Sequence, residues 1–358
     1  MKKLIALLLA LTMVLALAAC GAPAADPAPS TPDTTPVDGG NTDTNTDTTP
    51  TVDPVTLNIA YMPNWGALWA VATAQAKGYF AEEGITLNLV AFENGPTEIA
   101  AMESGSIDIS YIGPGAHKLC STGNAEVLLL QHLGDGDCII GLNGIKTLEE
   151  LEGKTIGYAA GTSSETILTV SLASVGLTLD DVNAMSMDAT ALTTAALSGS
   201  VDAVAAWSPY SLTILAEGND ATDICSNVDF ASLVSPGSWV VNPAWADANQ
   251  DVMIRFVRAM YKGMDYAAAA TTDDAIALEV AGYIADVISS DAETVLAQRY
   301  DGSWLTSAQV LEVLNSGALV QYYADQQATF IANEVVDPAT ALAPADFVLT
   351  DIMLEAGK

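Results

Sequence analysis

The chain has 358 residues, of which 50% are hydrophobic and 6% aromatic, and its formal net charge is −33. This length exceeds one ordinary hydrophobic core and suits two lobes. The negative charge excludes nucleic acid as a partner, because phosphate binding needs clustered Lys and Arg, and it is typical of a protein that stays soluble outside the cell.

The N-terminus is organised as an export signal followed by an anchoring site. Lys2 and Lys3 precede an apolar run over residues 4–19, which is shorter than the roughly 20 residues that span a bilayer as a helix. The run ends Leu-Ala-Ala-Cys-Gly at Cys20, which resembles the bacterial lipobox. We therefore expect a lipoprotein signal peptide over residues 1–19 and anchoring in the lipid bilayer through Cys20, on the extracellular face of the cytoplasmic membrane.

The segment after the signal is predicted to be a disordered tether. Residues 20–54 are rich in Ala, Pro, Thr, Asp and Gly and contain no aromatic residue. Such a composition cannot bury enough apolar surface to offset the entropy of ordering the chain. The folded part therefore begins at about residue 55.

Three cysteines follow the tether: Cys120, Cys138 and Cys225. One disulfide is compatible with secretion, but the sequence does not indicate which pair would form it. The two histidines and these cysteines have no metal-site spacing, so neither a metal nor a cofactor is expected.

Strand and helix patterns alternate through the rest of the chain. Apolar alternation and Gly stops predict strands over residues 55–60, 85–89, 107–112, 155–160 and 201–206. Helical stripes and capping residues predict helices over residues 65–77, 97–104, 162–175, 190–197, 251–270, 274–289 and 307–315. This alternation predicts an α/β protein with βαβ units and largely parallel central sheets.

A near-repeat indicates that the two lobes share a topology. Residues 100–108 and 194–202 both follow the order helix, Gly stop, polar residue and apolar strand. The final helices would return to the first lobe. The predicted parts are lobe 1 over 55–142 and 242–358, lobe 2 over 143–241, and hinge crossings near 141–144 and 237–242.

Four short motifs resemble those of one family of binding proteins. They are KGYFAEEGI at 77–85, GKTIG at 153–157, GTSS at 161–164, and LSGSVDA with WSPY within 197–210. In this order they resemble the nitrate/sulfonate/taurine-type solute-binding proteins of ABC transporters, whose superfamily includes binders of thiamine pyrimidine precursors. The resemblance covers about 55–270 and implies a periplasmic-binding-protein-like fold, a monomer, and a membrane permease with its ATPase as partners.

In open α/β sheets a ligand lies beyond the carboxyl ends of the strands. The Thr162 turn is the most informative such segment, because it begins a capped helix whose free N–H groups suit an anionic head group. Small loops and indoles complete the predicted site. The predicted ligand-binding residues are Asn64, Trp65, Asn94, Gly113, Pro114, Gly115, Thr162, Ser163, Ser164, Trp207 and Trp239.

The ligand class stays open at this point. The predicted loops contain no Lys or Arg, which disfavours a dianion, since a phosphate is normally met by Arg. A sulfonate such as taurine is the first prediction. An aminopyrimidine, with Glu93 or Glu165 accepting from its amino group, is the alternative, and nitrate ranks lower.

Catalysis and sensing are the rival functions. The chain has no Gly-x-Ser-x-Gly elbow, no phosphate-binding Gly-Lys-Ser/Thr loop and no metal constellation, so we expect a binding protein and no enzyme. A pyrimidine synthase in the same superfamily keeps an enzyme as the less favoured possibility. The sequence does not separate transport from surface sensing.

Overall fold

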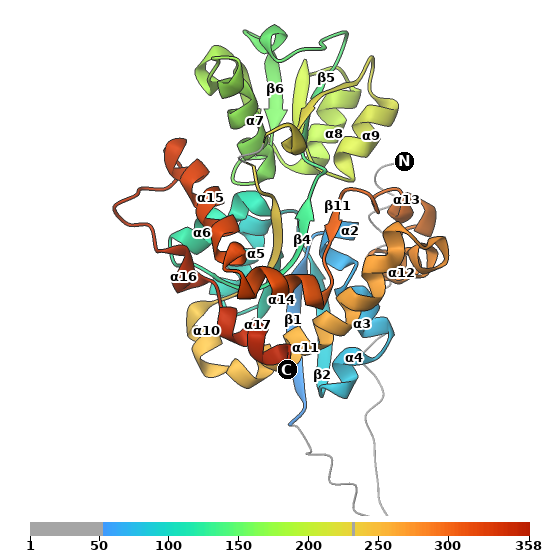
Figure 1. The fold of residues 1–358 in the computed structure, drawn as a ribbon. Helices are drawn as coiled ribbons and strands as arrows, with labels where there is room; N and C mark the ends of the chain where they lie inside the picture. The colour runs from blue at the N-terminus through green and yellow to red at the C-terminus, as the bar shows by residue number, and fades with distance from the viewer. Residues whose placement is uncertain (1–52, 231–232) are drawn as a thin grey trace, which may run out of the picture. The chain divides into compact units, whose positions relative to one another are not determined.

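The computed structural model describes residues 53–230 and 233–358. The predicted signal peptide, Cys20 and nearly all of the predicted tether lie outside the described residues. The described chain is built on two β-sheets with helices packed around them (Figure 1).

The larger sheet has six strands in the order β11-β4-β10-β3-β1-β2. Its strands are β1 (Val55–Tyr61), β2 (Ile85–Ala91), β3 (Ile109–Ile112), β4 (Glu126–Gly134), β10 (Pro236–Val241) and β11 (Gly302–Trp304). The smaller sheet has five strands in the order β7-β6-β8-β5-β9. Its strands are β5 (Cys138–Gly141), β6 (Thr155–Tyr158), β7 (Asn183–Ser186), β8 (Ala203–Ala206) and β9 (Thr222–Ser226).

Helices cover both sheets. Around the larger sheet lie α2 (Trp65–Leu68), α3 (Val71–Ala76), α4 (Tyr79–Glu82), α5 (Gly95–Glu103), α6 (Lys118–Ser121), α10 (Pro243–Ala248), α11 (Gln250–Ala267), α12 (Asp274–Ile288), α13 (Ala292–Leu296), α14 (Ser307–Asn315), α15 (Ala318–Ala332), α16 (Pro344–Phe347) and α17 (Thr350–Ala356). With the smaller sheet lie α7 (Ser163–Ser174), α8 (Ala189–Leu197) and α9 (Tyr210–Glu217). Five 3₁₀ turns are η1 (Pro114–His117), η2 (Glu149–Leu151), η3 (Leu179–Asp181), η4 (Asn227–Asp229) and η5 (Ala268–Thr271). The predicted helix over 65–77 is divided into α2 and α3.

The prediction of largely parallel sheets needs correction, because both sheets are mixed. β1 pairs parallel with β2 and β3, and β6 pairs parallel with β7 and β8. β10 is antiparallel to β3 and β4, and β5 is antiparallel to β8 and β9. The reason is that β5 and β10 each enter a sheet directly after the chain has crossed from the other one.

The crossings between the sheets lie earlier than predicted. The chain leaves the larger sheet after β4 and joins the smaller one at β5, so it crosses over residues 135–137. It returns between the end of β9 at Ser226 and the start of β10 at Pro236. β5 therefore belongs with the smaller sheet and β10 with the larger one, whereas the predicted boundaries at 142 and 242 assigned each to the other lobe.

The near-repeat in the sequence forms the same joint in both sheets. Gly105 and Gly199 end α5 and α8 with φ of 77° and 70°, which is a left-handed conformation that favours glycine. Three residues later an Asp carboxylate accepts from a neighbouring strand: Asp108 from the Asn58 N–H at 2.7 Å, and Asp202 from the Thr155 N–H at 2.9 Å. In each sheet the repeated Asp thus links the start of its strand to the neighbouring parallel strand, β3 to β1 and β8 to β6.

The three cysteines are buried free thiols. In the pairing of β5 with β9, Cys225 lies opposite Ile139, the residue after Cys138. Successive side chains of a strand point to opposite faces, so Cys138 and Cys225 pack into different apolar clusters of the smaller sheet. This arrangement prevents a disulfide between them.

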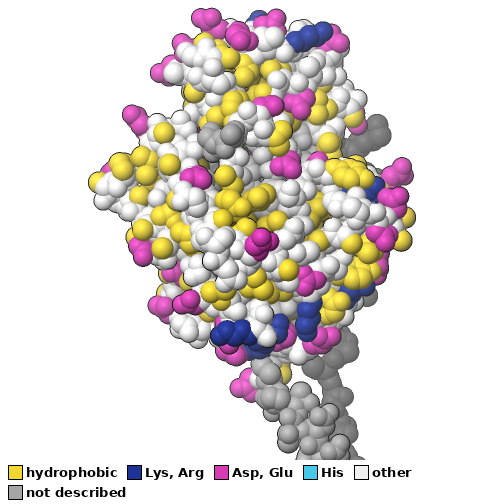
Figure 2. All heavy atoms as spheres, viewed as in Figure 1, with side chains coloured by type: hydrophobic (Ala, Val, Ile, Leu, Met, Phe, Trp, Pro, Cys, Tyr) yellow, Lys and Arg dark blue, Asp and Glu magenta, His cyan; other side chains and the backbone are white. Residues whose placement is uncertain are grey.

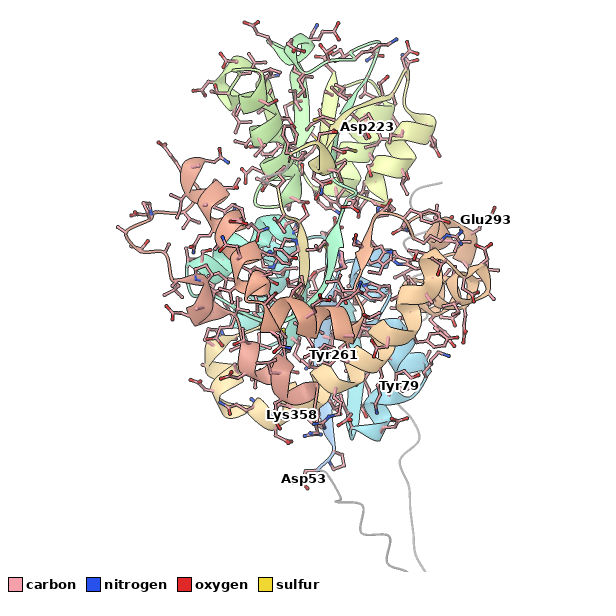
Figure 3. The ribbon with its side chains drawn as sticks, viewed as in Figure 1. Asp53, Tyr79, Asp223, Tyr261, Glu293 and Lys358 are labelled. Atoms are coloured by element: carbon pink, nitrogen blue, oxygen red, sulfur yellow. The ribbon has the colours of Figure 1, made fainter. Side chains whose placement is uncertain are left out.

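The core of the larger sheet is built around α11. This helix packs between α3 and α17, and the hydroxyl of Tyr261, labelled in Figure 3, donates to the Met353 carbonyl at 3.2 Å. None of the helices in the described residues combines the length and apolar composition needed to cross a membrane. Within 53–230 and 233–358, no group of His, Cys, Asp and Glu gathers as metal ligands.

Substitution of Trp239 can test whether this part of the larger sheet forms the core. Its ring is fully buried on β10 and packs against Phe256 of α11 with ring centroids 5.7 Å apart. We predict that Trp239→Ala lowers the free energy of unfolding by about 3–5 kcal/mol, because the substitution leaves a large cavity. Chemical denaturation measures this change. Trp207→Ala is the control, since Trp207 is only half-buried, and an equal loss in the two variants would contradict the assignment.

Candidate functional site

A cleft whose empty space, including the part open to solvent, measures about 710 Å³ lies between the two sheets, and we call it the main cavity. Its walls come from the loops after β1, β3, β4, β6 and β8 and from the segments that precede β10 and β11. The loops at the carboxyl ends of the parallel strands therefore meet there, as the sequence predicted. The predicted residues that line it are Asn64, Trp65, Gly113, Pro114, Thr162, Ser163 and Trp207.

Two of the other predicted residues serve the fold. Trp239 is not on the cavity wall, because it lies in the sheet interior and its indole donates to Gln131 at 3.0 Å. Ser164 is also fully buried: its hydroxyl donates to the Ala205 carbonyl at 2.7 Å and accepts from the Ala159 N–H at 2.9 Å. Both side chains therefore have partners inside the protein.

The last two predicted residues lie beside the cavity without lining it. Asn94 caps α5 by accepting from the Thr97 N–H at 3.1 Å, and its neighbours Gly95 and Pro96 form the wall instead. Gly115 lies against the backbone of Thr162, where a Cβ atom would come 2.0 Å from the carbonyl carbon. Glycine at this position therefore lets the two sheets' loops approach each other.

One wall of the main cavity is aromatic. The indoles of Trp65 and Trp304 have centroids 6.3 Å apart, and Trp304 lies 4.8 Å from the His132 ring. The His132 ring in turn stacks on Tyr111 at 6.0 Å with an interplanar angle of 14°. Trp65 Nε1 is buried and has no hydrogen-bond partner among the described residues, so this wall offers one free donor.

His132 is a neutral member of this wall. Burial lowers its pKa to about 3, and its Nε2 lies 3.4 Å from the Tyr111 hydroxyl. The imidazole packs against Gly237 of β10, where a Cβ atom would lie only 2.1 Å from the ring. The absence of a side chain at this position therefore makes space for the histidine. The histidine therefore contributes a flat surface and no positive charge.

The Thr162 turn forms the opposite wall. Thr162 caps α7 by accepting from the Ser164 N–H at 3.2 Å, so the predicted capped helix begins at this turn. Ser163, the first residue of α7, donates its hydroxyl to Asp137 at 2.5 Å. The turn thus presents to the cavity a serine that is already bonded to a carboxylate.

Glu165 does not reach the main cavity. It accepts from Lys118 at 3.3 Å, which links α7 to α6 across the two sheets. Glu93 does not line the cavity either. The predicted role of these two carboxylates as acceptors for an amino group is therefore not supported.

Two other carboxylates line the main cavity, and neither was predicted from the sequence. Asp137 lies in the first crossing segment, and Asp301 lies just before β11. Burial raises the pKa of each to about 6. Asp137 lies shortly after the apolar run of β4, which was an available signal. Asp301 comes from a part of the chain where the sequence offered no strand pattern.

The main cavity therefore carries negative charge without a positive partner. Among the described residues that line it, none is Lys or Arg. Figure 2 shows the same imbalance on one outer face, where Asp and Glu are scattered widely and Lys and Arg are fewer. Since a buried carboxylate is stabilised by a donor or a cation, the cavity suits a ligand that carries N–H groups.

Comparisons with known proteins agree with this fold. The family described as NMT1/THI5 like matches residues 67–273. A Brucella abortus protein named as a binding protein is 26% identical over 301 residues, which cover 84% of this chain and 92% of that protein.

Solved structures share the fold over nearly the whole described chain. The alkanesulfonate-binding protein of Xanthomonas axonopodis pv. citri, bound to MOPS, has a TM-score of 0.62 at 20% identity and covers 83% of this chain and 99% of its own. The nitrate-binding protein of Synechocystis PCC 6803 has a TM-score of 0.70 at 11% identity, with 85% and 88% covered. The predicted periplasmic-binding-protein-like α/β fold is confirmed.

The two cavity carboxylates predict a pH-dependent stability. Their pKa of about 6 in the folded protein exceeds the usual 3.8, so the folded state binds protons more tightly than the unfolded state. Between about pH 7.5 and pH 5 the protein should gain about 1 kcal/mol of stability for each carboxyl. Denaturant titrations of the wild type and of Asp137→Asn/Asp301→Asn measure this gain. An identical pH slope in the two proteins would contradict it.

Proposed function

Because the chain belongs to the NMT1/THI5-like family, we propose that it is the solute-capturing component of an ABC importer, with the main cavity as its capture site. The observation that carries this proposal is a cavity walled by loops from both sheets. The names of the similar proteins, which bind alkanesulfonate and nitrate, support the same role. A membrane permease and its ATPase would be its partners.

Capture would involve closure of two lobes, one around each sheet. The described residues that join the sheets are 135–137, 227–230 and 233–235, so we place the hinge there instead of at 141–144 and 237–242. The close approach of Gly115 to Thr162 corresponds to a closed arrangement.

The solute would carry at least one N–H group. Aliphatic sulfonates and nitrate present only acceptor oxygens, and these would face Asp137 and Asp301 without an intervening cation. An aminopyrimidine has an amino donor and a flat ring, which suit the carboxylates and the aromatic wall that contains Trp65 and Trp304. We therefore favour the aminopyrimidine. Among the sulfonates, taurine remains a candidate solute, because it carries an ammonium group.

An enzyme has less support from the site. Of the serines in the cavity wall, Ser163 donates to Asp137 and Ser235 accepts from Asn227, so neither of these bonds involves a histidine. His117 is buried, its Nδ1 lies 3.3 Å from the Pro114 carbonyl, and burial lowers its pKa to about 3. Neither Ser163 nor His117 therefore forms an activated nucleophile with its neighbours.

Matched pairs of solutes test the proposed ligand. One pair is taurine and ethanesulfonate, and the other is 4-amino-5-hydroxymethyl-2-methylpyrimidine and the same ring without the amino group. We predict that the amino member of at least one pair binds about 10- to 100-fold more tightly than its partner, because hydrogen bonds to a carboxylate contribute about 1.5–3 kcal/mol. Isothermal titration calorimetry measures the affinities.

Asp137→Asn and Asp301→Asn are the variants to compare in this experiment. Each should weaken binding of the amino member and reduce its advantage over the partner compound. Nitrate or ethanesulfonate bound as tightly as the amino compounds would rule out the proposed ligand class. The absence of binding by any compound would count against solute capture in this cavity.

The anchor is a separate prediction, and it rests on the sequence around Cys20. Cys20→Ala should release the protein into the medium or leave the signal peptide uncleaved, because the lipidated thiol would be lost. Membrane fractionation and the mass of the secreted chain measure the two outcomes. A variant processed and retained like the wild type would show that Cys20 is not the anchor.

A further inference from the structure

A smaller space adjoins the main cavity, and we call it the annex. Its empty space, which includes a part open to solvent, measures about 330 Å³, and it shares four wall residues with the main cavity: Pro114, Asp137, Ser163 and Ser235. The hydrogen bond from Ser163 to Asp137 lies in this common wall. The Asp137 carboxylate therefore borders both spaces.

Two buried amide side chains line the annex and not the main cavity. Asn227 is 3% exposed and Gln326 is 5% exposed. The oxygens Asn227 Oδ1 and Gln326 Oε1 have no hydrogen-bond partner among the described residues. A buried amide oxygen without a donor is costly, so both atoms mark a place where a donor is missing.

The hydrogen bonds of the amide nitrogens fix the orientation of both groups. Asn227 Nδ2 donates to the Gly134 carbonyl at 2.8 Å and to Ser235 Oγ at 3.1 Å. Gln326 Nε2 donates to the Pro114 carbonyl at 2.9 Å. Turning either amide over would bring its oxygen against a carbonyl oxygen, so the oxygens are the atoms left for the annex.

The remaining side chains of the annex wall supply one free donor, the hydroxyl hydrogen of Ser235, whose Oγ accepts from Asn227. The hydroxyls of Thr166 and Thr329 already donate to backbone carbonyls one turn earlier in their helices, at 3.5 and 3.2 Å. Among the described residues of the annex wall, none is Lys, Arg or His. The polar side chains of the annex wall are thus mainly acceptors, since they include one carboxylate and two amide oxygens without partners.

We propose that the annex is a subsite for a small protonated nitrogen, supplied either by an amino arm of the solute in the main cavity or by a free ammonium-type cation. A primary ammonium has three donors, which matches Asp137, Asn227 and Gln326 in number, and its charge matches the carboxylate. The first source rests on the proposed function, whereas the second does not.

Gln326→Met is the first test, because it removes Oε1 and keeps the length of the side chain. His117 Nδ1 lies 3.3 Å from the Pro114 carbonyl, so that oxygen keeps a partner in the variant. If the nitrogen comes from the solute, the variant should bind taurine or the aminopyrimidine about tenfold more weakly and the partner compounds unchanged. If it comes from a free cation, methylammonium chloride should raise the melting midpoint above that in sodium chloride in the wild type only.

A second pair of variants keeps the test independent of Gln326. Thr329→Leu places apolar bulk in the annex wall, and Ala328→Leu adds the same bulk at an exposed position of the same helix. Thr329→Leu should reproduce the losses of Gln326→Met, and Ala328→Leu should behave like the wild type. Melting midpoints in plain buffer identify any variant that has lost its fold.

The possible results separate the annex from the main site. One result would overturn the annex proposal and leave solute capture standing. In it, Asp137→Asn weakens binding of the amino compounds, Gln326→Met and Thr329→Leu do not, and methylammonium leaves the melting midpoint of the wild type unchanged. If no solute binds but methylammonium stabilises the wild type alone, the annex is supported and the proposed function fails. No response in either arm would overturn the annex as well.

Discussion

The rest of the structure depends on how the chain passes between the two sheets. After each crossing it forms a strand inside the sheet that it enters: β5 in the smaller sheet and β10 in the larger one. Each strand is hydrogen-bonded on both sides inside the sheet that it enters. The two crossing segments are also joined to each other, because the Gly134 N–H donates to the Ser235 carbonyl at 2.7 Å and the Asn227 N–H donates to the Asp137 carbonyl at 3.0 Å. Carboxylate, amide and hydroxyl groups of the cavity are therefore held on segments whose ends are fixed.

The fold and the chemistry of the cavity come from different parts of the chain. The sheets and their covering helices supply a scaffold that this chain shares with proteins named for binding anions. The charge of the cavity depends on a few side chains in the connecting segments, Asp137 and Asp301 above all. A change of two residues in such segments alters the charge of an acceptable ligand without changing the scaffold, so similarity of fold does not determine ligand class.

The sequence predicted the elements whose ends carry local signals. Gly105 and Gly199 mark the ends of two helices, and Thr162 caps a third, because these are backbone requirements of single positions. β4 was missed, since a strand that is buried on both faces has no alternation of apolar and polar residues. Asp301 and Trp304 could not be assigned to the site, because a long-range pairing of β11 with β4 brings them there. Trp239 was assigned wrongly, because the predicted hinge crossing at 237–242 is largely the buried strand β10.

The placement of Cys138 and Cys225 on opposite faces of one sheet bears on where this protein can fold. Stability that depends on a disulfide exists only after oxidation, so such a protein needs an oxidising compartment. Here the described cysteines are buried thiols that pack as small apolar groups, with Cys225 Sγ 3.1 Å from Ser171 Oγ. The described fold therefore does not rely on a bond between Cys138 and Cys225, and its packing there is that of the reduced thiols.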